Sequence, residues 1–153
     1  MGEPDTVRTM TIRGCIAIGA AVFMAAAAGT TISSQTKTVW DGVYTAAQAD
    51  RGLKLYTDNC AACHGAEMVA GAGAPSLAGP EFQFSWNKKP ASELFDYMKS
   101  FMPPGQPGGL TDSEYADIVS ALLRANKFPE SATAELPAAK AELEGITILA
   151  TKP

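Results

Sequence analysis

The sequence has few of the residues that build metal sites and disulfide frameworks. Its 153 residues include one His and three Cys. A single His excludes metal sites made of several histidines, and three Cys are too few for a disulfide framework. Large apolar residues are scarce as well, because from Gly29 onward Ile, Leu, Val, Met, Phe, Tyr and Trp make up 32 of 125 residues. Burial of so few side chains makes a thin core, so we expect something other than side chains to fill part of the interior.

Positive charge is also limited. The chain has 12 Lys and Arg against 16 Asp and Glu, which gives a net charge of −4. This balance argues against nucleic acid as a main partner and against a polybasic membrane-binding surface. The hydrophobic fraction of 46% overstates the core, because 27 of those residues are Ala.

The N-terminal region has the pattern of a secretory signal. Residues 1–13 include two Arg, and residues 14–29 carry no charge and end in a run of alanines. We therefore predict a signal peptide over residues 1–28 and a mature protein that is soluble in the periplasm. Translation can begin at Met1 or at Met10, since either start leaves the pattern intact.

Two other interpretations of this region remain open. An uncleaved segment would anchor the protein in the membrane, facing the periplasm, although 16 uncharged residues are short of the roughly 20 that span a bilayer. A buried Ala-rich core helix is the other interpretation, although the segment lacks amphipathic spacing. Contact with a membrane is expected only if the segment is not cleaved.

The remaining chain divides into three parts. Residues 29–44 form a polar leader with a few apolar residues, residues 45–129 form the main domain, and residues 130–153 form a C-terminal extension that packs on the domain. Within the extension, we expect a short helix near residues 138–144, followed by an apolar run at residues 146–149 that lies against the domain.

Helix-capping residues mark the helices of the main domain. Thr45 with Gln48, and Thr111 with Glu114, have the spacing of capping boxes, and Ser92 is placed to cap a further helix. The intervening residues 65–91 are rich in Gly, Ala and Pro and predict no regular element. A structureless stretch of this length is unusual in a compact domain unless it packs on a non-protein group.

The only His follows a pair of cysteines, in the run Cys60-Ala61-Ala62-Cys63-His64. This C-x-x-C-H pattern is typical of c-type haem attachment, in which both thiols form thioethers to the porphyrin and the His binds the iron. A zinc site would need a fourth ligand close by. A thioredoxin-like site would need a βαβ setting, and a plain disulfide would leave the His unexplained.

A second axial ligand must come from elsewhere in the chain. Three Met follow the motif: Met68, Met98 and Met102. Met68 is too close in sequence to reach the opposite haem face easily, and Met98 lies on the apolar face of a helix. Met102 precedes two prolines in a loop, so we predict Met102 as the second iron ligand.

Residues 43–129 resemble a class I monohaem cytochrome c. The resemblance rests on the helix before Cys60, on the motif itself, on the Pro-containing segment after it and on the Met102-Pro103 loop. It implies an all-α fold with three to four main helices and long irregular loops around one covalently bound haem c. The opening Val39–Thr45 and the Phe-Met-Pro-Pro-Gly loop are similar to small cytochromes, or fused cytochrome domains, that accept electrons from periplasmic PQQ-dependent dehydrogenases.

The resemblance also implies roles for individual residues. The carbonyl of Pro75 would accept a hydrogen bond from His64 Nδ1, and Leu77 would pack on the proximal face of the haem. Trp86, with Asn87, would lie near a haem propionate, or else Trp86 is an ordinary core residue.

A helix crossing is implied as well. Gly52 and Tyr56 would cross the last main helix near Ala121 and Leu122.

The expected function is one-electron transfer and not enzyme catalysis. A dehydrogenase would supply electrons, and an oxidase or another cytochrome would accept them. Three alternatives remain open: a permanent subunit of a quinoprotein dehydrogenase complex, docked through the apolar residues of the leader and the tail; a ligand-binding haem sensor; and a haem-free thiol redox protein.

Overall fold

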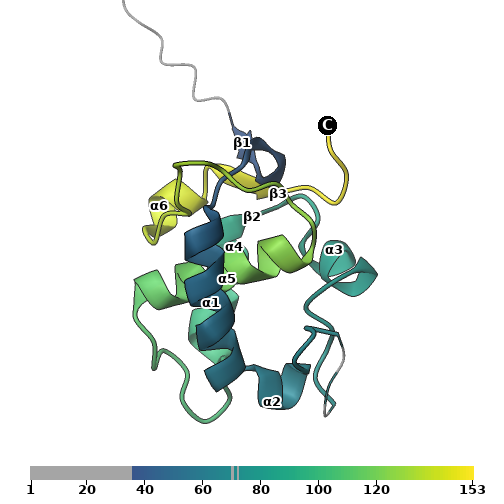
Figure 1. Ribbon diagram of the computed structural model, residues 1–153, viewed down its shortest axis with the longest axis vertical. Coiled ribbons are helices and arrows are strands. Elements are labelled where there is room, and N and C mark those ends of the chain that lie inside the picture. Colours follow the sequence, from purple (N-terminus) through teal and green to yellow (C-terminus); the bar gives the residue numbers. More distant parts are fainter. Residues whose placement is uncertain (1–35, 70, 72) are drawn as a thin grey trace, which may run out of the picture. The chain divides into compact units, whose positions relative to one another are not determined.

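The computed structural model describes residues 36–153 except 70 and 72 (Figure 1). The predicted signal peptide lies outside these residues. Every element described below belongs to the unit formed by residues 34–153.

The described chain is mainly helical, as expected. Three longer helices correspond to the three helices predicted for the main domain, and shorter helices join or follow them. The helices are α1 (Ala46–Asn59), α2 (Ala61–His64), α3 (Pro80–Trp86), α4 (Ala91–Phe101), α5 (Asp112–Ala125) and α6 (Lys140–Leu143), with a 3₁₀ helix η1 (Val39–Asp41) before them.

The most extensive helix contact joins α1 and α5, which cross each other in Figure 1. Gly52 is buried at the crossing, and a Cβ at this position would overlap the carbonyl oxygen of Asp117. The two backbones therefore touch, which only a residue without a side chain permits. This contact explains a Gly inside a helix, where it would otherwise cost about 1 kcal/mol relative to Ala.

The predicted crossing of α1 with α5 is present, and at Gly52 the closest backbone atoms belong to Asp117 and Ile118, one turn before Ala121 and Leu122. Tyr56, Ala121 and Leu122 are all buried.

The two predicted capping boxes have different outcomes. The Thr111 box is confirmed, because the Thr111 hydroxyl accepts from the Glu114 amide and the Glu114 carboxylate accepts from the Thr111 amide. Thr45 caps α1 through the amide of Gln48, but the Gln48 side chain does not return to it. The Gln48 carboxamide instead donates to the carbonyl of Leu136 at 2.9 Å and accepts from its amide at 2.7 Å.

The expectation of no regular element over residues 65–91 is wrong in its second half. Helix α3 begins at Pro80, where the missing amide hydrogen costs nothing, and strand β2 (Lys89–Pro90) follows it. Ser92 is not a cap either: α4 begins one residue earlier, after Pro90, and the Ser92 side chain is buried inside the helix.

A small three-stranded sheet, absent from the prediction, joins the two ends of the described chain. Its strands are β1 (Lys37–Thr38), β2 and β3 (Ile146–Ile148), in the order β1-β3-β2. Strand β3 runs parallel to β1, with Lys37 opposite Ile146, and antiparallel to β2, with Lys89 opposite Ile148. The apolar run near the end of the chain is thus the central strand.

The leader and the tail bury their own apolar residues. Tyr44 is fully buried, and its hydroxyl donates to the carbonyl of Phe128 at 2.7 Å. The Trp40 indole donates to the carbonyl of Leu149 at 2.9 Å. The other buried apolar residues of these segments are Val39, Val43, Leu136, Leu143, Ile146 and Ile148. The hypothesis that these residues form an external docking surface is therefore wrong, because the domain itself covers them.

An ion-pair network ties the tail to both crossing helices. The Arg51 guanidinium on α1 donates to both carboxylate oxygens of Asp117 on α5, at 2.9 and 3.0 Å, and to Glu135 in the tail at 3.1 Å. The Asp117 carboxylate is largely buried, so its bidentate pairing satisfies a charge that would otherwise be costly to bury.

No helix in the described part of the chain combines the length and the apolar character needed to cross a bilayer.

The backbone contact at Gly52 predicts the effect of a single added methyl group. Gly52→Ala should lower the free energy of unfolding by about 2 kcal/mol or more, because the helices must separate to admit the Cβ. Chemical denaturation of the holoprotein measures this. Helix propensity alone predicts the opposite sign, a gain of about 1 kcal/mol, so a stabilised variant would contradict the contact. Ala47→Gly, at an exposed position of the same helix, calibrates that propensity effect.

The Gln48 side chain predicts a specific loosening of the tail. Gln48→Leu removes two hydrogen bonds and leaves the buried amide and carbonyl of Leu136 without partners, so we expect a loss of about 2 kcal/mol. Amide exchange at Leu136 should accelerate more than exchange within α5. Gln48→Glu keeps the acceptor and should have a smaller effect; equal exchange at Leu136 in all three proteins would show that Gln48 does not hold the tail.

Candidate functional site

The Cys-Ala-Ala-Cys-His run lies at the junction of α1 and α2. Cys60 ends α1, where its amide donates to the carbonyl of Tyr56 at 2.8 Å. The amides of Cys63 and His64 both donate to the carbonyl of Cys60, at 3.1 and 3.0 Å. One helical turn therefore carries two cysteines and the histidine, and both cysteines are free thiols.

The ring of His64 is buried and its orientation is set by one hydrogen bond. Nδ1 lies 2.8 Å from the carbonyl oxygen of Pro75, the contact that the resemblance implies. A carbonyl can only accept, so Nδ1 is the donor, and Nε2 is the nitrogen that carries the lone pair in the neutral tautomer. Among the described residues Nε2 has no hydrogen-bond partner, which leaves it able to bind a metal.

The loop after α2 folds closely onto the same turn. The Tyr56 hydroxyl donates to the carbonyl of Gly65 at 2.6 Å. A Cβ at Gly71 would overlap the carbonyl oxygen of Cys63. Gly71 is therefore a position in this loop at which a side chain has no room.

The three candidate methionines differ in their surroundings. Met68 and Met98 belong to the buried core, whereas Met102 is half-buried. Met102 ends α4, its amide donates to the carbonyl of Met98 at 2.8 Å, and its own carbonyl accepts from the Tyr115 hydroxyl at 2.9 Å. The peptide bond to Pro103 is cis. Hydrogen bonds from two helices therefore fix the Met102 backbone.

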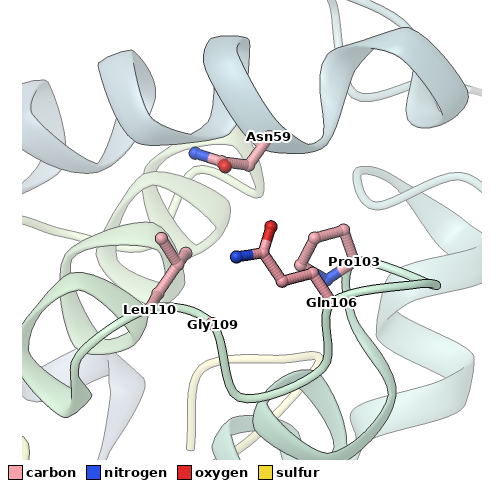
Figure 2. A pocket seen from close by; sticks show the side chains of 5 residues that line it. All are labelled: Asn59, Pro103, Gln106, Gly109 and Leu110. Carbon is pink, nitrogen blue, oxygen red and sulfur yellow. The ribbon is translucent and has the colours of Figure 1, made fainter.

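The segment after Met102 lies beside the segment before Cys60. A small pocket between them is lined by Asn59, Pro103, Gln106, Gly109 and Leu110 (Figure 2). Asn59, the last residue of α1, lies across this pocket from Gln106 in the loop (Figure 2). The two segments predicted to carry haem contacts are thus neighbours, although 42 positions separate Cys60 and Met102 in the sequence.

Trp86 lies at the end of α3 in a row of aromatic rings. It packs edge-on against Tyr97 at 5.8 Å, and Tyr97 contacts Phe101 at 5.1 Å. The Lys89 ammonium lies 5.1 Å from the centre of the Trp86 ring. The Asn87 side-chain oxygen accepts from the Ala150 amide in the tail at 2.9 Å.

These residues fit a covalently attached haem. Two free thiols and a histidine with an available Nε2 share one turn, and a thioether donor stands on a fixed backbone. Large apolar side chains are also left exposed: Phe84 by 90%, Phe101 by 58%, Val69 by 54% and Tyr97 by 47%. A soluble domain gains stability when an apolar group covers such surface.

The other uses of the cysteines are less well supported. Burial and the nearby Cys63 raise the pKa of the Cys60 thiol to about 11. A nucleophilic or redox-active thiol needs a lowered pKa instead. The described residues contain no cluster of three or more His, Cys, Asp or Glu side chains that could hold a metal ion.

One functionally suggestive residue escaped the sequence analysis. Asn126, the residue after α5, is buried and holds the loop containing Leu77 through side-chain hydrogen bonds. Leu77 itself is half-buried. A polar residue at a helix C-terminus is common, and only its tertiary partners show its role.

Residues 47–120 match the model of a family described as cytochrome C oxidase, cbb3-type, subunit III. The match supports a c-type cytochrome domain over this segment, and such a domain serves haem-based electron transfer. The helices, with the small sheet as an addition, are consistent with an all-α class I cytochrome c fold. Comparisons with curated proteins and with solved structures gave no match.

Proposed function

We propose that the protein is an exported one-electron carrier with a single c-type haem, attached through Cys60 and Cys63 and ligated by His64 and Met102. The hydrogen bond between His64 Nδ1 and the Pro75 carbonyl is the observation that carries this proposal. It selects Nε2 as the free nitrogen of a histidine that shares a turn with two free thiols.

The haem iron supplies one-electron chemistry by cycling between the ferric and ferrous states. The protein chain supplies the attachment of this group, the donor strength of its histidine ligand and the apolar surface of its pocket. The thiols of Cys60 and Cys63 form thioethers that keep the group attached, and the Pro75 carbonyl increases the donor strength of the His64 imidazole. Leu77 and Trp86 supply apolar surface to the pocket.

Met102 is the proposed second ligand because protein structure must hold a methionine sulfur, which is a weak ligand to ferric iron. The hydrogen bonds from Met102 to Met98 and from Tyr115 to Met102 supply that support. A methionine ligand raises the reduction potential and leaves no open coordination position. Because hydrogen bonds hold Met102 in place, a ligand-binding sensor is less favoured, since a sensor needs a coordination position that is open or easily vacated.

We propose a periplasmic dehydrogenase as the electron donor and an oxidase or another cytochrome as the acceptor. The export pattern of residues 1–28 supports the compartment, and the similarity to cytochromes that serve quinoprotein dehydrogenases supports the donor. A permanent place in a dehydrogenase complex is less favoured, because the apolar residues of the leader and tail pack within this chain.

Changing the cysteines tests covalent attachment. Cys60→Ala and Cys63→Ala should each leave one thioether, which shifts the pyridine haemochrome band to longer wavelength, and the double variant should release its haem into acidified organic solvent. Cys15→Ala is the control, since it lies in the predicted signal peptide, and should behave as wild type. Haem that is extractable from the wild-type protein would disprove attachment, and a protein without haem would favour a thiol redox protein.

Changing Met102 tests the second ligand. Met102→Ala should lose the sulfur-to-iron charge-transfer band in the far red and lower the midpoint potential, because a sulfur ligand favours the ferrous state. Met98→Leu, a substitution of similar volume at a buried methionine, should change neither. Visible spectroscopy and redox titration measure both properties. Carbon monoxide should bind the reduced Met102→Ala protein but not the wild type at neutral pH; binding to the wild type would indicate a sensor.

A further inference from the structure

The side chain of Asn126 makes three hydrogen bonds from a buried position. Asn126 follows the last turn of α5 and is only 5% exposed. Its Nδ2 donates to the carbonyl of Leu122 at 2.8 Å and to the carbonyl of Leu77 at 2.9 Å. Its Oδ1 accepts from the amide of Gly79 at 2.9 Å. The Asn126 carboxamide therefore bonds to the backbone of residues 77–79 twice, as a donor to Leu77 and as an acceptor from Gly79.

This segment begins two residues after Pro75. Two further hydrogen bonds hold residues 76 and 77: the Leu77 amide donates to the carbonyl of Met68, and the Ser76 amide donates to the Glu81 carboxylate. The first joins this loop to another part of the same loop, and the second uses an exposed side chain. Among the described residues, the Asn126 side chain provides a buried link from residues 77–79 to a long helix.

Asn126 thereby links the backbone that follows Pro75 to the end of α5. The donor to the Pro75 carbonyl, His64, stands on α2 directly after α1, and α1 contacts α5 at Gly52. Both partners of the His64–Pro75 hydrogen bond are thus connected to α5 through neighbouring residues.

We propose that Asn126 is a positioning residue that holds the Pro75 carbonyl in hydrogen-bond contact with His64 Nδ1 and thereby sets the donor strength of the His64 imidazole. This inference rests on the proposed function, in which His64 Nε2 binds the haem iron. Partners of the second nitrogen of a ligating histidine fix its orientation and raise its basicity, and their loss weakens the ligand.

The physical consequence has a definite direction. If the carboxamide is removed, the 77–79 backbone loses two of its ties and the Nδ1–H···O contact weakens. A less basic imidazole donates less charge to the iron, which favours the ferrous state. The midpoint potential should therefore rise, which is opposite to the change expected for loss of Met102.

Asn126→Leu in the haem-loaded protein tests the proposal. We expect amide exchange at Gly79 to become about tenfold faster, as for the loss of one hydrogen bond, with faster exchange of the His64 Nδ1 proton and a higher midpoint potential. NMR measures both exchange rates, and redox titration measures the potential. Ser120→Ala is the matched control, because its buried hydroxyl bonds only to Ala116 within α5. The control should leave all three properties unchanged.

Two results would overturn the proposal. One is faster exchange of the Gly79 amide with unchanged exchange of the His64 Nδ1 proton and an unchanged midpoint potential. That result would show that Asn126 stabilises the loop without affecting His64. The other comes from the wild type: a His64 Nδ1 proton that exchanges far faster than the Gly79 amide would show that the loop and the ring open separately. This second measurement needs no variant, so it stands even if Asn126→Leu does not fold.

A conservative substitution separates the two sides of the carboxamide. Asn126→Asp keeps an acceptor for Gly79 but loses the donor to Leu77, so we expect a smaller rise in potential than with Leu. An unchanged potential in Asn126→Asp and Asn126→Leu would contradict the proposal. Failure of the proposed function looks different, because the wild type would then carry no covalent haem in the pyridine haemochrome assay.

Discussion

Two helix backbones touch at Gly52, and the rest of the domain takes its geometry from that contact. Because no side chain separates α1 from α5, the distance between them cannot adjust by a rotamer change, as it can where side chains interdigitate. The Arg51–Asp117 pair lies at the same crossing and adds a polar restraint on rotation. The two crossed helices therefore form one rigid unit, and the segments proposed to bind haem are attached to it.

The two ends of α5 support opposite parts of the proposed site. Tyr115, near the start, fixes the Met102 backbone, and Asn126, after the end, fixes the loop that follows Pro75. Eleven residues separate them, about 16 Å along a helix. That is a reasonable spacing for groups that must support ligands on two faces of a flat cofactor. The C-terminal end of α1 leads directly into Cys60 and His64, and Tyr115 on α5 holds the backbone of Met102 at the end of α4, so both proposed iron ligands are tied to the crossed helices.

Features that depend on residues within one turn of each other were predictable from the sequence. Features that depend on residues distant in the sequence were not. The Cys60–His64 run is contiguous, and the ends of the long helices follow from capping residues such as Thr45 and Thr111, because those patterns act within one turn. The sheet was missed because its strands are two or three residues long and pair with partners more than 50 positions away in the sequence. Gln48 and Asn126 were misjudged or missed for a related reason: an amide side chain shows its partners only after the chain has folded around it.

The central place of β3 in the sheet has a consequence for the order in which the molecule is completed. Strand β1 near the start of the described chain and β2 near its middle do not pair with each other. Each pairs with β3, residues 146–148, instead. During synthesis residues 146–148 emerge after both partner strands. The crossed helices can associate earlier, since their contacts lie within the first four-fifths of the sequence. Docking of the tail therefore completes the fold. Before it docks, two strand edges and the apolar residues of the leader are exposed to solvent and can contact other unfolded chains.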